Sequence, residues 1–133
     1  MAITNIVGVK NHCAFPIYVY NAENPGDTQN RPMPGVEIHP GDTYGHNMWI
    51  PWCTNAADFA KHRIQIATAF NPNFCIWQEN SSDGDHVRYC TDNTFHCTGN
   101  LIPGNSNVGG NRILYIEGTL ASGADLRIHL ESL

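Results

Sequence analysis

The stretch FCIWQENSSDGDHVRYC, residues 74–90, decides the fold class because it holds the clearest hairpin in the chain. Phe74–Glu79 and His86–Cys90 are strand candidates, and Asn80–Asp85 joins them through Asp83-Gly84. A glycine that follows an aspartate between two strand candidates is a strong signal for a hairpin turn. The stretch therefore predicts two neighbouring antiparallel strands.

Other strand candidates lie on both sides of this hairpin. Apolar residues at every second position, rich in β-branched and aromatic side chains, are typical of strands. Pro16 predicts an edge strand or a bulge for its own segment, because proline has no N–H to donate. In the last candidate, Leu126, Ile128 and Leu130 are predicted to face inward. The candidates outside the hairpin are Ile3–Val9, Cys13–Tyr20, Val36–Ile38, Arg63–Phe70, Arg112–Glu117 and Asp125–Leu130.

Turn-rich segments and one short helix candidate separate these strands. The turn chemistry of Asn21–Gly35 predicts a loop. Thr54–His62 is the only segment that favours a helix, of about two turns at most, with Asn55 as its N-cap. Thr91–Gly110 is weakly patterned and predicts a long surface loop tied down by cysteines.

These elements predict a single all-β domain that spans residues 1–133. Many short strands with heavy turn chemistry indicate an antiparallel β-sandwich or a small barrel, with one short helix and long loops. A length of 133 residues is usual for one domain, and a composition of 41% hydrophobic and 14% charged residues favours a folded chain.

The charge of the chain excludes one class of partner. The formal net charge is -5, and the seven lysines and arginines are scattered singly. Because nucleic-acid binding depends on clustered cations, we expect no nucleic-acid partner. Binding to a glycan or to a neutral lipid surface needs no positive field and remains open.

The sequence also gives an expectation for the cellular location of the protein. It contains no apolar run long enough to span a bilayer and no visible signal peptide. Five cysteines are many for a protein of the reducing cytosol. We therefore expect the mature form of a secreted or exported protein, with a cytoplasmic protein as the alternative.

The cysteines show no zinc-finger spacing, so disulfides are the favoured interpretation. Cys90 and Cys97 bracket a short loop and are the first candidate pair. Cys53 with Cys75, or Cys13 with Cys53, are the next candidates. Because the number of cysteines is odd, at least one cysteine is expected to remain a free thiol.

The segment Asn11–Tyr20, NHCAFPIYVY, followed later by His39-Pro40-Gly41-Asp42, resembles the opening of thaumatin-like proteins and of related small fungal yeast-phase-type proteins. In those families an asparagine, a cysteine and an aromatic residue precede a strand, and a similar turn follows a second strand. The resemblance covers roughly the first third of the chain.

A second resemblance is to aegerolysins, small acidic β-sandwich proteins that recognise membrane lipids. It rests on Asp83-Gly84-Asp85 before one strand and on Gly118–Asp125 before the last strand. Both resemblances imply a secreted or exported binding protein of defence type.

The stretch Val36–Cys53, VEIHPGDTYGHNMWIPWC, is the densest in groups that could bind a ligand. Tyr44, Trp49 and Trp52 form an aromatic cluster beside turns, of the kind that stacks on sugar rings or lies at a lipid interface. The alternative is that one or both tryptophans close one end of the core. A further alternative is that one tryptophan binds the ligand and the other closes the core.

Histidines of the same region suggest a metal site as an alternative. His39, His46 and His62 could together supply nitrogens for zinc or copper, although their spacing matches no established motif. The other interpretation is that each is a separate, partly exposed side chain. A calcium ion is a further alternative at the carboxylates around the hairpin end, which are Glu79, Asp83, Asp85 and Asp92.

The sequence therefore predicts a non-enzymatic, lectin-like protein that binds a carbohydrate or lipid surface through Tyr44, Trp49 and Trp52, with no catalytic residues and no cofactor. The alternative is a small metal-dependent enzyme that uses His39, His46 and His62. A structural or protein-binding module is a third hypothesis, and a homo-oligomer remains open.

Overall fold

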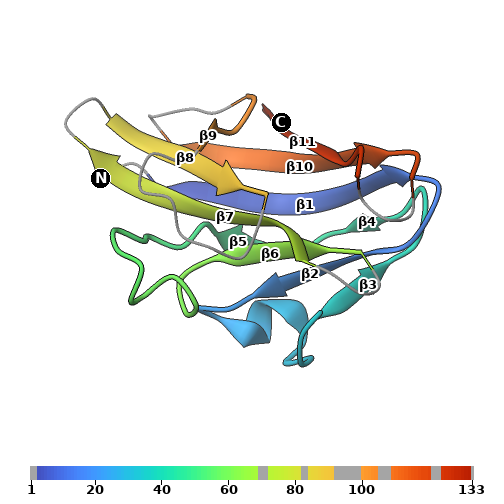
Figure 1. The fold of residues 1–133 in the computed structure, drawn as a ribbon, viewed down its shortest axis with the longest axis horizontal. Coiled ribbons are helices and arrows are strands. Elements are labelled where there is room, and N and C mark those ends of the chain that lie inside the picture. The colour runs from blue at the N-terminus through green and yellow to red at the C-terminus, as the bar shows by residue number, and fades with distance from the viewer. Residues whose placement is uncertain are drawn as a thin grey trace.

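The chain folds into two β-sheets that pack face to face, as predicted for an all-β sandwich. The computed structural model describes residues 3–68, 72–81, 84–91, 100–104, 109–120 and 124–132. Figure 1 shows the hairpin of β7 (Pro72–Ser81) and β8 (Gly84–Cys90) in front of β1 (Thr4–Cys13), which belongs to the other sheet.

The first sheet has the strand order β11-β10-β1-β4, and β5 also pairs with β1. Its strand β1 runs parallel to β10, whereas the other pairs are antiparallel. The expected antiparallel arrangement therefore has one exception, which is possible because β1 and β10 are far apart in sequence and no hairpin sets their direction. The other strands of this sheet are β4 (Thr43–Tyr44), β5 (Met48–Trp49), β10 (Gly110–Gly118) and β11 (Arg127–Ser132).

The second sheet is antiparallel throughout, with the order β3-β2-β6-β7-β8-β9. The predicted hairpin is confirmed, because Ser81 of β7 pairs with Gly84 of β8. The residues between them, Ser82 and Asp83, lie outside the described part of the chain. The remaining strands are β2 (Ile17–Asn21), β3 (Val36–Ile38), β6 (Ile64–Ala67) and β9 (Asn100–Leu101).

The main core fills the space between the two sheets. Apolar side chains from the facing sides of both sheets, such as Ile6 and Leu114 of the first and Val19 and Ile76 of the second, are fully buried there. The predicted inward positions Leu126, Ile128 and Leu130 belong to the same core. Alternation along each strand places these residues on one face, so burial of that face holds the sheets together.

The predicted strand Cys13–Tyr20 is confirmed from Ile17 onward as β2, but it is not continuous, because the chain turns at Pro16 and enters the other sheet. Strand β1 continues through Asn11 to Cys13, and β2 begins at Ile17. The buried Asn11 side chain holds this turn, since its amide nitrogen donates to the Phe15 carbonyl at 2.9 Å and its oxygen accepts from the Cys13 N–H at 2.8 Å.

The predicted helix at Thr54–His62 is also wrong. The segment forms successive turns, in which Asn55 accepts from the Asp58 N–H at 3.0 Å as the cap prediction required. Its one buried residue in the described turns, Phe59, packs edge-on against Trp77 with ring centroids 5.4 Å apart. This anchor holds the turns against the outer face of the second sheet, where so short a segment gains little from helix formation.

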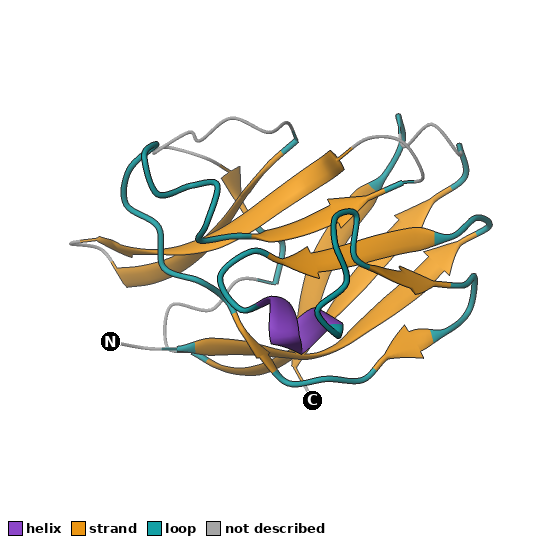
Figure 2. Cartoon of the chain, turned by 90° about the horizontal axis from the view of Figure 1, so that it is seen from below, coloured by secondary structure: helices purple, strands orange, loops and turns teal. Residues whose placement is uncertain are grey.

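The helical element of the described chain lies instead in the predicted loop Asn21–Gly35. It is the short 3-10 helix η1 (Pro25–Thr28), which Figure 2 shows among the loops beside the strands. The predicted long loop Thr91–Gly110 contains β9, but residues 92–99 and 105–108 lie outside the described part. Among the described residues, no helix has the length and apolar character needed to cross a membrane.

Candidate functional site

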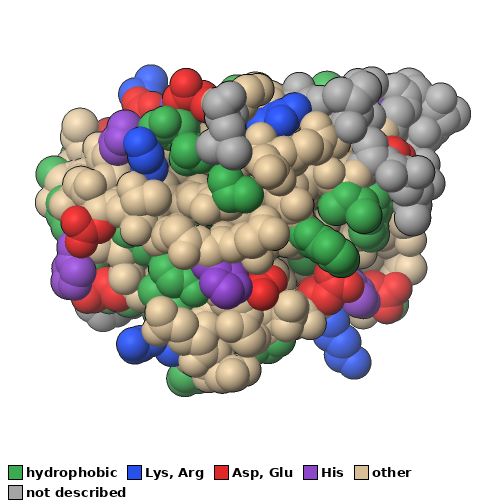
Figure 3. All heavy atoms as spheres, turned by 180° about the vertical axis from the view of Figure 1, so that it is seen from behind, with side chains coloured by type: hydrophobic (Ala, Val, Ile, Leu, Met, Phe, Trp, Pro, Cys, Tyr) green, Lys and Arg blue, Asp and Glu red, His purple; other side chains and the backbone are tan. Residues whose placement is uncertain are grey.

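A groove of about 600 Å³ opens on the side of the sandwich where β5 and the segment around η1 meet. Figure 3 views the molecule from behind and shows hydrophobic, acidic and histidine side chains side by side on that face. The groove combines two tryptophans with carboxylates and amides. Its lining residues are Ile3, Asn21, Glu23, Asn24, Asp27, Asn47, Trp49, Ile50 and Trp52.

Trp49 faces outward because its neighbours face inward. Met48 and Ile50 on either side of it are buried in the core, and residues that alternate along a strand point to opposite faces. Trp49 pairs with Asn5 of β1, so the sheet holds its backbone. Its side chain remains 62% exposed, which is unusual for so large an apolar group and leaves the ring accessible to a ligand.

Trp52 is held by β7 of the second sheet. It forms an isolated parallel bridge with Gln78, whose backbone N–H donates to the Pro51 carbonyl at 2.7 Å. The Cys53 N–H in turn donates to the Gln78 carbonyl at 3.1 Å. These bonds fix the backbone on both sides of Trp52, whose side chain is half-buried and lines the groove.

The polar wall of the groove is organised by the buried Asn21. Its side-chain oxygen accepts from the N–H groups of Glu23 and Asn24, each at 3.1 Å, and thereby turns the chain at the end of β2. Its amide nitrogen donates to Oδ2 of Asp27 at 3.3 Å. These bonds hold the backbone at Glu23 and Asn24 and the carboxylate of Asp27 in one loop, which lines the groove together with the tryptophans.

Tyr44 lies behind this wall and does not line the groove. Its hydroxyl donates to the Asp27 carbonyl at 2.6 Å, and its ring stacks on His46 with centroids 6.0 Å apart. Burial is the main cause that raises the pKa of this hydroxyl above its usual value. Of the three predicted aromatic residues, the structure brings Trp49 and Trp52 to one groove, and Tyr44 supports the loop that faces them.

The three histidines predicted as metal ligands contact three different carboxylates. His46 lies 3.2 Å from Oδ1 of Asp27, and His62 lies 3.2 Å from Oε1 of Glu23. His39 instead contacts Glu37 of β3 at 3.3 Å. Within the described residues, no group of three histidine, cysteine, aspartate or glutamate side chains could hold a metal ion. His39, His46 and His62 therefore do not converge in this structure.

The carboxylates considered for calcium can be described only in part. Glu79 of β7 forms an ion pair with Arg88 of β8 at 2.5 Å, so it is held by a cation of the protein itself. Asp83 and Asp92 lie outside the described residues. Asp85, which pairs with Asn80 in the hairpin, accepts a hydrogen bond from the Gln78 side chain through its backbone carbonyl.

The structure contains no disulfide between Cys53 and Cys75 or between Cys13 and Cys53, so these two predicted pairs are wrong. Cys13, Cys53, Cys75 and Cys90 are buried, and Cys97, the proposed partner of Cys90, lies outside the described residues. Cys13 and Cys53 belong to different buried clusters, which explains why they do not meet. Cys53 shares a cluster with Cys75, but its sulfur contacts the carbonyl of Asn55 at 3.4 Å.

The burial of these thiols predicts low reactivity in the native protein. Burial, together with the nearby carboxylates Asp125 and Glu117, raises the pKa of Cys13 to about 11, and burial raises that of Cys53. Because the thiolate is the reactive form, iodoacetamide at about pH 8 should modify Cys13 and Cys53 slowly in the folded protein. After unfolding without reductant, both should react fully. A peptide mass map in which either residue resists alkylation after unfolding would indicate a disulfide.

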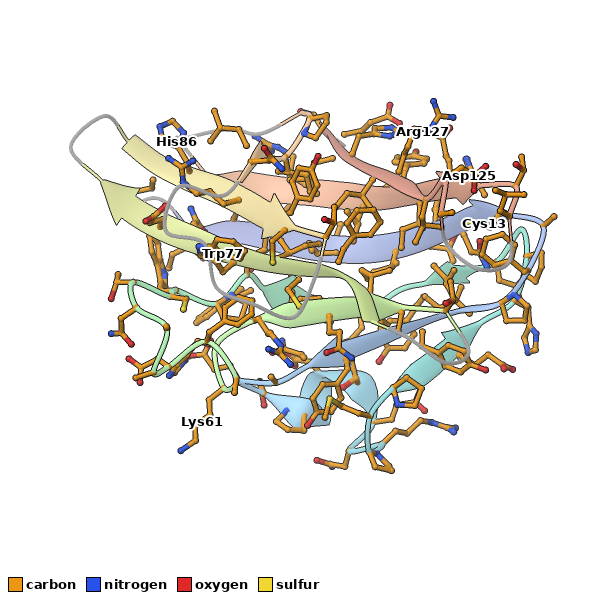
Figure 4. All side chains as sticks on the ribbon, in the orientation of Figure 1. Cys13, Lys61, Trp77, His86, Asp125 and Arg127 are labelled. Carbon is orange, nitrogen blue, oxygen red and sulfur yellow. The ribbon has the colours of Figure 1, made fainter. Side chains whose placement is uncertain are left out.

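A second hollow, of about 540 Å³, lies near Asp125 and carries no tryptophan among its described lining residues. Asp125 accepts from the Thr119 hydroxyl at 2.5 Å and from the backbone N–H groups of Thr119 and Leu120 at 2.9 Å each. The Thr119 hydroxyl is the largest of the causes that lower the pKa of Asp125 to about 2. Figure 4 shows Asp125 near Cys13, at the end of the sandwich far from His86. This carboxylate therefore stabilises the turn before β11 through these hydrogen bonds.

Comparison with protein-family models, with curated proteins and with solved structures gives no match for the chain. The function must therefore be argued from the groove itself. Sequence reasoning missed its polar wall, because Asn21–Gly35 was predicted only as a loop. The signal available was the density of hydrogen-bonding side chains in Asn21–Asp27, which no local pattern connects to Trp49.

Proposed function

We propose that this protein is a non-enzymatic, lectin-like carbohydrate-binding protein and that the groove of Trp49 and Trp52 is its binding site. The observation that carries the proposal is the combination, in one groove, of an exposed tryptophan with a fixed row of amide and carboxylate groups. An aromatic ring stacks on the apolar face of a sugar, while amides and carboxylates form hydrogen bonds with its hydroxyl groups.

The polar wall favours a sugar over a lipid chain. Asn21, Asn24 and Asn47 line the groove together with two carboxylates. An acyl chain could not form hydrogen bonds with the side chains of Asn24 and Asn47 or with Oε2 of Glu23, and burying polar groups without partners is costly once water is displaced. Sugar hydroxyl groups both donate and accept, so they can replace the lost water. Lipid binding is therefore the alternative that the experiment compares with glycan binding.

Binding to a glycan array, compared with binding to vesicles of neutral phospholipid, tests this proposal. We expect the wild-type protein to bind one class of glycan and not the vesicles. Trp49→Ala and Trp52→Ala should each weaken glycan binding about tenfold or more, because loss of a central aromatic contact costs about 2 kcal/mol.

Tyr18→Ala is the matched control for these variants. Tyr18 is a partly exposed aromatic residue on β2 whose hydroxyl donates to Glu37 at 2.7 Å, outside the groove. It should bind glycan like the wild type, and all three variants should keep the β-sheet circular dichroism spectrum. Glycan binding that survives both tryptophan substitutions, or binding to vesicles alone, would overturn the proposal.

A further inference from the structure

The charge of the groove narrows the class of carbohydrate that it can take. Both charged residues among its described lining residues, Glu23 and Asp27, are acidic. On the basis of the function proposed above, we infer that the groove selects amino sugars that carry a free, protonated amine, over neutral and acidic sugars. An ammonium group is attracted by both carboxylates and by the faces of the tryptophans.

Two arginines near the polar wall have partners of their own. Arg63, whose carbonyl accepts from the Ala22 N–H beside the polar wall, has its own guanidinium buried over the ring of Phe59 and bonded to Gln65. Arg31 donates to the side chain of Gln29 at 3.2 Å. Neither arginine is among the residues that line the groove.

The two carboxylates are held in place by the side-chain amide of Asn21 and by two histidines. Asp27 is bonded by the Asn21 amide and by His46, and Glu23 by His62. None of these partners is a lysine or an arginine. Glu23 uses only Oε1 in its contact with His62, which leaves Oε2 to accept a hydrogen bond from a ligand.

Fixed carboxylates distinguish an ammonium from an acetamide of the same sugar. An N-acetylated sugar presents a neutral amide at the same carbon, so it gains the aromatic contact but not the charge attraction. An acidic sugar places its own carboxylate near Glu23 and Asp27, and like charges repel. The expected order of affinity is therefore amino sugar, then N-acetylated sugar, then acidic sugar.

Calorimetric titration with three oligosaccharides of equal length tests this order. The ligands are oligomers of glucosamine, of N-acetylglucosamine and of galacturonic acid, titrated at low salt near neutral pH. Because a pair of opposite charges near a protein surface contributes up to about 1 kcal/mol and the groove offers two carboxylates, we expect the glucosamine oligomer to bind about tenfold more tightly than the acetylated one. Salt at about 0.5 M should reduce this difference by screening.

Neutral replacements of the carboxylates test the cause of the preference. Asp27→Asn and Glu23→Gln should each weaken binding of the glucosamine oligomer about threefold, because the two carboxylates share the tenfold preference, and leave the acetylated oligomer nearly unchanged. Glu37→Gln is the matched control, since Glu37 is a carboxylate that also contacts a histidine and a tyrosine but lies outside the groove. It should alter no affinity.

The possible results separate this inference from the proposed function. If the glucosamine and acetylated oligomers bind equally, and only Trp49→Ala weakens both, the preference for a cationic sugar is wrong and the proposed function stands. If the carboxylate variants and Glu37→Gln weaken binding alike, the charge of the groove is not the cause and the inference also fails. If none of the three oligomers binds and the glycan array is also empty, the proposed function itself fails.

Discussion

Replacing Asn11 by leucine is expected to destabilise the fold by about 3 to 5 kcal/mol, because it leaves several buried backbone groups without partners. The Asn11 side chain is fully buried and donates to the carbonyls of Phe15 and Ile38, at 2.9 and 2.8 Å, and accepts from the Cys13 N–H. It thus joins the crossing from the first sheet to the second with the end of β3. Urea unfolding measures the change.

Asn5→Leu is the control for this effect, since Asn5 lies on the same strand and forms an exposed hydrogen bond with Asn111 at 3.3 Å. It should change the free energy of unfolding by less than about 1 kcal/mol. If Asn11→Leu and Asn5→Leu shift the urea midpoint equally, the buried hydrogen bonds of Asn11 do not stabilise the fold as described.

Replacing Gln78 by leucine is expected to lower both stability and ligand binding. The fully buried Gln78 side chain accepts from the Thr4 N–H at 3.2 Å and donates to the Asp85 carbonyl at 3.0 Å. It therefore links β1 and β8 to the strand that holds the backbone around Trp52. Loss of these two bonds should cost about 2 to 4 kcal/mol, measured by urea unfolding.

The same variant distinguishes a residue that positions the groove from one that contacts the ligand. Trp49→Ala should reduce glycan affinity and leave the urea midpoint almost unchanged, because its side chain is mostly exposed. Gln78→Leu should reduce both quantities. An unchanged midpoint for Gln78→Leu would contradict the role given to its side chain, whatever the result for binding.

Local pattern accounts for the parts of this protein that were predicted correctly. The β7–β8 hairpin follows from Asp83-Gly84 between two apolar runs, and the inward side of Leu126, Ile128 and Leu130 follows from alternation. The errors arose where a distant contact outweighed local preference. Phe59 packs on Trp77 and holds turns where a helix was expected, and Asn11 reaches Ile38 and turns the chain at Pro16.

The cysteines also show that spacing along the chain cannot predict a contact between distant residues. Spacing along the chain suggested that Cys53 and Cys75 could form a bridge, but it carries no information on the direction of a side chain. In the structure both sulfurs are buried in one cluster with Trp77, without a disulfide between them. A bridge requires close approach and a specific geometry of both side chains, which only the packing of the two segments decides.

The all-β fold class could be predicted from the sequence alone, because strand period and turn chemistry act over a few neighbouring residues. The placement of Glu23 and Asp27 in one groove with Trp49 and Trp52, and of Tyr44 behind the loop that carries Asp27, appears only in the folded protein. The physical reason is that the groove forms where β5, paired with β1, meets the loop that Asn21 organises after β2. Such a meeting depends on how the two sheets pack, and no local pattern contains it.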